Sequence, residues 1–281
     1  MTQAAFKKIV WAHYKKHGRK LPWRPASQKE LRDKNFPYRV LVSEIMLQQT
    51  QVDRVIPKFD AFVKKFPSFG ALANASTGDV LRAWQGLGYN RRALALKRAA
   101  ETIVKEHSGI LPSSEKELLA LPGVGAYTAG ALRAFVFNQP SVIIETNIRT
   151  AYIHHYAELR GQNADKSGNF HDQELLLLIE ETLDRKNPRE WYWALMDYGS
   201  YLKKEFGNAS RKSKHYTKQS KFEGSRRQIR GAVLRALVQK PKTIVVLIKE
   251  TKKKKGDIVS VLADLKKEGF VKQKGRTFSL V

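Results

Sequence analysis

The chain of 281 residues contains no cysteine, so disulfide bonds and metal centres held by thiolates are excluded. Acidic residues are also scarce: 26 Asp and Glu stand against 52 Lys and Arg, which leaves a formal net charge of +26. This excess is larger than solubility requires and indicates a polyanionic partner. It is uneven, because residues 208–281 hold 21 basic and only 5 acidic residues.

Long apolar runs are absent as well. No stretch of 18 apolar residues occurs, and the amphipathic N-terminal segment lacks the apolar core of a signal peptide. We therefore expect a cytoplasmic, nucleoid-associated protein without a membrane partner, and we expect it to be a monomer. The length is sufficient to bury a full hydrophobic core in one large or two smaller domains.

The stretch from Ser114 to Asn147 holds the clearest chemical signal. Ser114 and Glu117 form a capping box that is typical of a helix start. The segment 122–125 (PGVG) then interrupts the helix, because proline lacks an amide donor and glycine permits unusual backbone angles. Apolar residues at helical spacing follow at once. The sequence predicts a helix-hairpin-helix.

Such a hairpin can hold a phosphate, because the second helix begins with unpaired amides and glycines let a strand approach the backbone. An ordinary tight turn between packed helices is the alternative. The carboxylate at Glu145, reached through an apolar VII run, and the charge of the chain favour the phosphate site. We predict nucleic-acid contacts from this part of the hairpin: Pro122, Gly123, Val124, Gly125 and Thr128.

A second candidate lies in the segment 37–52, PYRVLVSEIMLQQTQV. Pro37 is typical of a helix start, and four apolar residues at helical spacing are expected to point inward: Val40, Leu41, Ile45 and Leu47. Glu44 lies among them. A carboxyl group with little water around it tends to keep its proton, so we expect a raised pKa and a role as general acid. A glutamate at a helix edge, paired with an arginine, is the alternative.

Four ordered blocks resemble the helix-hairpin-helix DNA glycosylase superfamily, and within it the MutY-type adenine glycosylases. They are LPWR at 21–24, the segment 37–52, GLGYNRRALAL at 86–96, and LPGVG-xx-TA followed by Glu145 and Asn147. The resemblance covers about residues 1–206. It implies a DNA partner that contains a mispaired or damaged base, which the enzyme extrudes from the duplex.

The resemblance also implies residue roles. Glu44 would protonate the leaving purine, Glu145 would stabilise the oxocarbenium-like sugar, and Asn147 would orient that carboxylate or the attacking water. The Gln48, Gln49 and Thr50 turn would fill the gap left by the extruded base. Tyr89 would act as an aromatic wedge beside it, although a core tyrosine near a turn is the alternative.

This chain departs from the family pattern at several points. The superfamily normally has Asp where this chain has Glu145, and a displacement of about 1 Å can cost on the order of 10²-fold in rate. Relatives that also cut the strand carry Lys where this chain has Tyr127, so we expect a monofunctional enzyme with no Schiff base. Without cysteine we expect no iron–sulfur cluster and no other cofactor or metal. We also expect no C-terminal lesion-reading domain of the usual type.

The expected fold is all-α with two lobes and a small C-terminal module. Residues 1–28 with 139–207 would form one lobe without an iron–sulfur loop, and 29–138 a six-helix lobe with the hairpin. Within the latter, residues 91–106 predict a basic-faced helix carrying Arg91, Arg92, Lys97 and Arg98. A basic linker at 208–224 would lead to a winged-helix-like domain at 225–281, with three helices and a small β-hairpin.

The sequence therefore favours a DNA repair glycosylase that removes a flipped adenine from a mispair and leaves an abasic site. A mismatch thymine or uracil glycosylase on the same fold is one alternative. Another is a noncatalytic DNA-binding protein derived from this fold, and a regulator built around the C-terminal module is a third.

Overall fold

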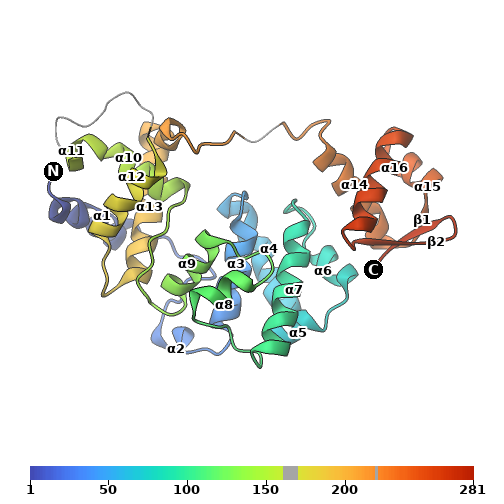
Figure 1. The fold of residues 1–281 in the computed structure, drawn as a ribbon, viewed down its shortest axis with the longest axis horizontal. Coiled ribbons are helices and arrows are strands. Elements are labelled where there is room, and N and C mark those ends of the chain that lie inside the picture. The colour runs from blue at the N-terminus through green and yellow to red at the C-terminus, as the bar shows by residue number, and fades with distance from the viewer. Residues whose placement is uncertain (161–169, 219–220) are drawn as a thin grey trace. The chain divides into compact units, whose positions relative to one another are not determined.

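The computed structural model describes residues 1–160, 170–218 and 221–281, and these are predominantly helical, as expected from the sequence (Figure 1). Among them, no helix is both long and apolar enough to span a bilayer. The helices are α1 (Gln3–His17), α2 (Gln28–Leu31), α3 (Phe36–Leu47), α4 (Val52–Lys65), α5 (Phe69–Ala73), α6 (Thr77–Ala83), α7 (Arg91–Glu106), α8 (Glu115–Ala120), α9 (Ala126–Phe135), α10 (Thr146–His154), α11 (Tyr156–Arg160), α12 (Asp172–Thr182), α13 (Pro188–Phe206), the 3₁₀ turn η1 (Ala209–Lys212), α14 (Arg226–Gln239), α15 (Ile244–Thr251) and α16 (Lys255–Lys267).

Contacts divide the chain into two compact units. The first contains residues 1–41, 113–120 and 124–218, and the second contains 42–112, 121–123 and 219–281. The boundary runs through α3 and through the turn between α8 and α9. The C-terminal module thus shares a unit with α4 to α7. The lobe boundaries predicted from the sequence group the residues differently and stay a prediction.

In the first unit, α13 packs against α1, α9 and α10. Its first half places large aromatic side chains in the core: Trp191 is fully buried, and its ring lies 6.3 Å from that of Phe6 on α1. The Phe6 ring in turn lies 5.1 Å from that of Tyr152 on α10. Burial of aromatic surface of this size accounts for most of the stability of a small helical unit.

A buried ion cluster joins the segment after α1 to α13. Asp197 is 3% exposed and accepts hydrogen bonds from Arg19 Nε at 2.6 Å and Arg24 Nη1 at 2.8 Å. Burial of Asp197 raises its pKa, but the hydrogen bonds and positive charge of the two arginines outweigh this and lower the pKa overall. Arg24 belongs to the LPWR motif, so that motif has a structural role.

In the second unit, α7 packs against α5 and α6, and α4 packs against α6. Phe62 on α4 and Trp84, directly after α6, are fully buried, and their rings lie 5.8 Å apart. Helix α7 has the predicted bounds, 91–106.

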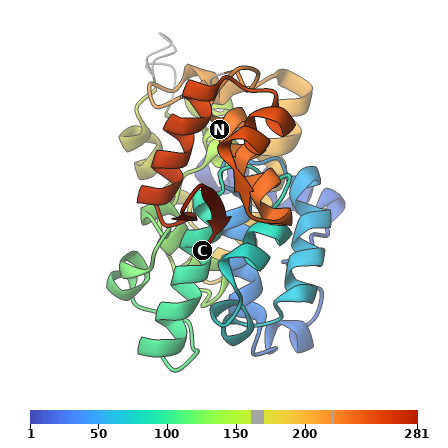
Figure 2. The same ribbon diagram turned by 90° about the vertical axis from the view of Figure 1, so that its right-hand side faces the viewer.

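The C-terminal module contains the three helices and the hairpin that the sequence indicates, at α14, α15, α16 and strands β2 (Val271–Lys274) and β3 (Thr277–Leu280). A two-residue strand, β1 (Lys242–Thr243), was not expected. It pairs with β3, so the antiparallel sheet has the order β1-β3-β2 (Figure 2, orange to red). The winged-helix interpretation stays a prediction.

The predicted basic linker at 208–224 is not loose throughout. Ser210 in η1 and Ser213 are buried, η1 packs against α10, and Ser213 forms a β-bridge with Phe170. The linker prediction was therefore wrong for residues 209–213. The segment has no large apolar side chain, so its sequence gives no sign of burial. Only its small residues are buried, and the side chains of Arg211 and Lys212 face solvent. Residues 219–220 of the predicted linker lie outside the described residues.

Candidate nucleic-acid interface and active site

The hairpin forms where the sequence places it. Ser114 Oγ accepts from the Glu117 amide at 3.3 Å, and the Ser114 hydroxyl donates to the Glu117 carboxylate, so the two residues of the predicted capping box are bonded to each other. Helix α8 ends at Ala120 and α9 begins at Ala126. The apolar faces of these two helices pack together. The residues between them make the turn.

The two glycines of the turn serve different purposes. Gly123 has φ +82°, and a Cβ there would lie 2.8 Å from the Cβ of Ala95, so both the backbone angle and the packing require glycine. Gly125 has φ −98° and caps α9, and a Cβ there would meet nothing within 4 Å. The fold itself does not require glycine at 125. The smooth, exposed surface at this helix start is suited to an external group, such as a phosphate.

The other hairpin residues differ in access. Pro122 and Tyr127 are partly exposed, whereas Val124 and Thr128 are 7% and 3% exposed. Val124 and Thr128 therefore offer little surface to DNA in this structure. The sequence pattern marks Thr128 as a motif residue, but its helical spacing already places it on the buried side of α9.

Glu44 lies on α3 and is 6% exposed. Its neighbours Ser43, Ile45 and Met46 are buried as well, and because consecutive residues point about 100° apart, α3 is buried on most of its circumference here. The role of Glu44 as general acid stays a prediction. A carboxyl group at low exposure near the end of a helix is well suited to donate a proton to a bound base.

Helix α3 ends in the predicted Gln48–Thr50 turn. Gln49 is exposed and has φ 56°, a left-handed conformation that non-glycine residues adopt at turns. The Gln48 side chain lies 3.5 Å from the Gly123 carbonyl, so this turn and the hairpin turn are neighbours within the second unit. Tyr89, with φ 46°, forms the tip of the turn before α7.

Arg92 holds both turns. Its Nη1 donates to the carbonyls of Ile45 at 2.8 Å and Met46 at 2.9 Å, and also to that of Gln48. Its Nη2 donates to Thr50 Oγ1 at 3.0 Å and to the Gly88 carbonyl at 3.3 Å. These acceptors include carbonyls at the C-terminal end of α3, which lack partners within the helix.

Arg92 is more buried than expected for a residue on the predicted basic face of α7. Burial lowers its pKa to about 10, while the nearby Tyr89 acts in the opposite direction. The guanidinium therefore stays charged at neutral pH. Its centre lies 5.4 Å from the Tyr89 ring centroid, which is a cation–π distance. Lys97 is also buried, at 9% exposure, so the prediction of a basic face was wrong for Arg92 and Lys97.

Glu145 caps α10. Its Oε1 accepts from the amides of Asn147 at 2.8 Å and Ile148 at 2.9 Å, and its Oε2 accepts from Asn147 Nδ2 at 3.3 Å. Desolvation raises the pKa of Glu145, and the two amides, together with the positive charge of Arg149 and Arg19, oppose that rise. The amides and the positive end of the helix favour the carboxylate form.

The backbone around Glu145 is fixed by close packing. A Cβ at Gly199 of α13 would lie 1.9 Å from the Asn147 carbonyl oxygen, and a Cβ at Gly130 of α9 would lie 2.4 Å from Ile143 Cγ2. The Tyr192 hydroxyl donates to the Ser141 carbonyl at 2.5 Å and accepts from the Ile143 amide at 3.2 Å. The apolar run before Glu145 is thus held between α9 and α13.

Glu145, Asn147, Tyr127 and Thr128 belong to the first unit, and Glu44, the Gln48–Thr50 turn and Tyr89 to the second. The expectation that Glu44 and Glu145 face one nucleoside stays a prediction. Sequence reasoning missed Arg92, Gly130 and Gly199 as positioning residues. For Arg92 the only available signal was its place directly after the GLGYN turn, and for the glycines their place inside apolar helices.

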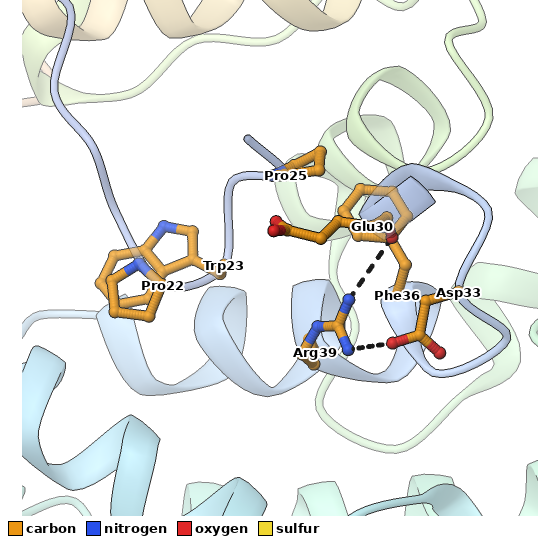
Figure 3. A pocket seen from close by; sticks show the side chains of 7 residues that line it. All are labelled: Pro22, Trp23, Pro25, Glu30, Asp33, Phe36 and Arg39. Carbon is orange, nitrogen blue, oxygen red and sulfur yellow. Dashed lines mark hydrogen bonds and ion pairs between the residues drawn. The ribbon is translucent and has the colours of Figure 1, made fainter. Parts of the chain in front are cut away.

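Residues 25–36, a polar segment between the LPWR motif and α3, line a small pocket together with residues on either side of them (Figure 3). The segment contains α2, whose start is capped by Ser27. Arg39 Nη1 lies 2.5 Å from Asp33 Oδ2, and Trp23 and Phe36 supply apolar walls. This arrangement explains how the segment is held against α3.

Known proteins share sequence with this chain over the residues that hold these features. Residues 42–170 match the family model described as "HhH-GPD superfamily base excision DNA repair protein". An adenine DNA glycosylase of Buchnera aphidicola is 34% identical over 207 residues, which is 72% of this chain and 54% of that protein. The human adenine DNA glycosylase is 34% identical over 197 residues, 70% of this chain and 35% of that protein. This chain thus spans about half, or less, of the length of these relatives.

Solved structures show the same fold. A thermostable thymine-DNA glycosylase superposes with a TM-score of 0.58 at 23% identity, covering 70% of this chain and 86% of that one. A trapped endonuclease III–DNA covalent intermediate superposes with a TM-score of 0.50 at 15% identity, covering 72% and 86% of the two chains.

Proposed function

Because residues 42–170 belong to the HhH-GPD superfamily of base excision DNA repair proteins, we propose that this protein is a DNA glycosylase that removes adenine from a mispair. The observation that carries the proposal is Glu44, buried on α3 directly before the Gln48–Thr50 turn. It lies within residues 42–170, the segment that matches the model of base excision DNA repair proteins. The activity of the relatives is a guide to this chain, which matches only part of their length.

In the proposed reaction, the bond between the base nitrogen and C1′ of the sugar breaks, and its electron pair leaves with the base. Glu44 gives its proton to the departing base, which neutralises the charge that develops there. The sugar becomes an oxocarbenium-like cation, and the carboxylate of Glu145 stabilises it. Water then adds to C1′ and releases a proton, which leaves an abasic site.

Glu145 can take the place of the usual aspartate because its extra methylene is accommodated at the start of α10. Both backbone amides remain bonded to it at normal distances, and Asn147 contacts its second oxygen. The longer side chain therefore keeps an N-cap geometry that aspartate would also adopt. This supports a carboxylate that is held in place and ionised.

Tyr127 supports hydrolysis without strand cleavage. It occupies the first turn of α9 and is partly exposed. Its phenol cannot form a Schiff base with the sugar, which a lysine at this position could do. An aromatic ring can instead stack on an extruded base. The released products are then a free base and an intact strand with an abasic site.

A panel of duplexes tests the proposal, each with one defined mispair, by measuring the free base released and the strand breaks formed before and after alkali. We expect adenine release and strand breaks only after alkali. Glu44→Gln should lower single-turnover release by about 10²–10⁴-fold, the usual contribution of a general acid. Lys64→Gln, on an exposed turn at the far end of α4, is the matched control and should retain activity.

Other outcomes would replace the proposal. Thymine or uracil release without adenine would change the target base while keeping the mechanism. No release from any duplex, together with tight binding to mispairs, would indicate a noncatalytic DNA-binding protein.

A further inference from the structure

The C-terminal module is fixed to the second unit next to the Tyr89 turn. Arg227, at the start of α14, donates a hydrogen bond to the Tyr89 hydroxyl, and its guanidinium lies 5.2 Å from the Tyr89 ring. One residue further on, Gln228 Oε1 accepts from Lys253 Nζ at 3.2 Å. Lys253 belongs to an unbroken run, Lys252–Lys255, at the start of α16. The first turn of α14 thus contacts both the predicted wedge, through Arg227, and the lysine run, through Gln228.

Further contacts bind the module to α7 and α6. Glu268 accepts from Arg91 Nε at 2.8 Å and from Arg230 Nη1 at 3.0 Å, so one carboxylate bridges α7 and α14. Arg82 on α6 donates to the Val238 carbonyl at 2.5 Å. A groove between the module and α7 reaches Pro122 and Gly123 of the hairpin turn. The module is therefore continuous with the predicted DNA-contacting residues of its own unit.

The charge of the module is available for an external anion. Residues 225–281 contain 16 basic and only 4 acidic residues. Three of the four acids already form ion pairs with arginine or lysine: Glu250 with Lys242, Asp264 with Arg226, and Glu268 with Arg91 and Arg230. Lys252, Lys254 and Lys255 are exposed. The fourth acid, Asp257, is exposed and lies two residues after Lys255, so a single carboxylate stands beside four lysines. An exposed run of lysines with such an excess of positive charge is typical of a phosphate-contacting surface.

We propose that Arg227 and Lys252–Lys255 form a second DNA-contacting surface, which extends the duplex footprint from the Tyr89 turn onto the C-terminal module. The surface would bind backbone phosphates without reading sequence, because lysine acts there as a flexible point charge. It rests on DNA being the partner, as in the proposed function, but it does not require base release. The module would then add affinity for the duplex to that of the hairpin and the Gln48–Thr50 turn.

The test measures binding of the full-length protein to an undamaged, fluorescently labelled duplex across a range of NaCl concentrations. The tail variant carries Lys252→Asn, Lys254→Gln and Lys255→Gln. Asparagine is chosen at 252 because that residue has φ 53°, which asparagine tolerates. Lys253 is left intact because it contacts Gln228. The control variant removes three charges at exposed helix ends on α4 and α7: Lys64→Gln, Lys65→Gln and Lys105→Gln.

A plot of log affinity against log salt has a negative slope. We expect the magnitude of this slope to decrease by roughly 2 to 3 in the tail variant, at about 0.9 per lost phosphate contact, and to change little in the control. Equal slopes in the tail variant, the control and the unmodified protein would overturn the proposal. Circular dichroism checks that both variants are folded.

A second measurement needs no variant. Photo-crosslinking of the unmodified protein to a bromodeoxyuridine-containing duplex, followed by peptide mapping, should label the segment around Lys252–Lys255. Crosslinks confined to the hairpin and the Gln48–Thr50 turn would contradict the second surface. The base-release panel is read separately, so loss of the proposed activity and loss of this surface are distinguishable.

Discussion

The ionised form of Glu145, which the proposed reaction needs, lowers the stability of the folded protein. Its carboxylate is desolvated, which raises its pKa, yet it accepts two amide hydrogen bonds that favour the charged form. A raised pKa in the folded state means that keeping Glu145 ionised costs folding free energy above the ordinary titration range of glutamate. That cost disappears as the pH falls through the raised pKa. Strain of this kind is often concentrated at functional positions.

Replacing Glu145 with glutamine should separate the two effects. Glutamine keeps an oxygen acceptor for the amides of Asn147 and Ile148 but carries no charge. We expect Glu145→Gln to melt at the same temperature as the unmodified protein, or higher, at pH 7.5, while base release is lost. Thermal melting and single-turnover release, measured on the same preparations, check this. A variant that melts much lower would show that the charge itself holds α10.

The same carboxylate sets a pH dependence. Base release by the unmodified protein should decline on acidification at a pH above the usual range for glutamate, because the reaction needs Glu145 ionised. Glu145→Asp, which restores the residue usual in the superfamily, should remain active and place this decline at lower pH. Release that stays constant down to pH 5 would argue against an ionised Glu145 in the reaction.

At the scale of single elements, helical periodicity was a reliable guide for α7, whose bounds match the prediction at both ends. It could not show that Arg92 turns inward, because that depends on where the end of α3 lies in three dimensions. The short elements α2 and β1 were missed for a related reason: four and two residues are too few for a periodic signal. Local spacing thus identified the helices, while tertiary contacts decided which charges they bury.

The hairpin turn gives an element-scale prediction from its two glycines. Gly123→Ala should lower stability, since a left-handed backbone costs about 1 kcal/mol and the clash with Ala95 about 1–3 kcal/mol more. Gly125→Ala should leave stability within about 0.5 kcal/mol but weaken DNA binding, because its Cβ would point into open space where a phosphate is expected. Urea unfolding and duplex affinity, measured for both variants, check the contrast. If Gly125→Ala bound DNA normally, the amides at the start of α9 would not form the contact.

At the scale of the whole chain, the net charge indicated a polyanionic partner, and the spacing of apolar residues indicated a predominantly helical protein with a distinct C-terminal module. It did not indicate that the module would share a compact unit with α4 to α7, because the contacts of Arg82, Arg91 and Tyr89 with the module join residues far apart in the sequence. The four ordered motifs contain the candidate site residues, but the residues that hold these in place are distributed over other parts of the chain.

The ion cluster of the first unit gives the last prediction. The pKa of Asp197 is lowered overall, so its contribution to stability is present above the pKa of an unfolded aspartate and is lost as the pH falls through the folded value. Asp197→Asn leaves Arg19 and Arg24 without their charged partner and should destabilise by about 3–5 kcal/mol at pH 7. The difference from the unmodified protein should shrink towards pH 3. Urea unfolding at several pH values checks this, and a constant difference would contradict it.

The shared anchor at Arg92 limits how this protein could be re-engineered. One guanidinium secures both the glutamine turn after α3 and the tyrosine turn before α7. A chimera in which only one of the two turns comes from a similar protein would combine that turn with an arginine placed for the other turn, and some of these hydrogen bonds would be lost. Grafts should therefore carry both turns and the arginine together, as a single cassette.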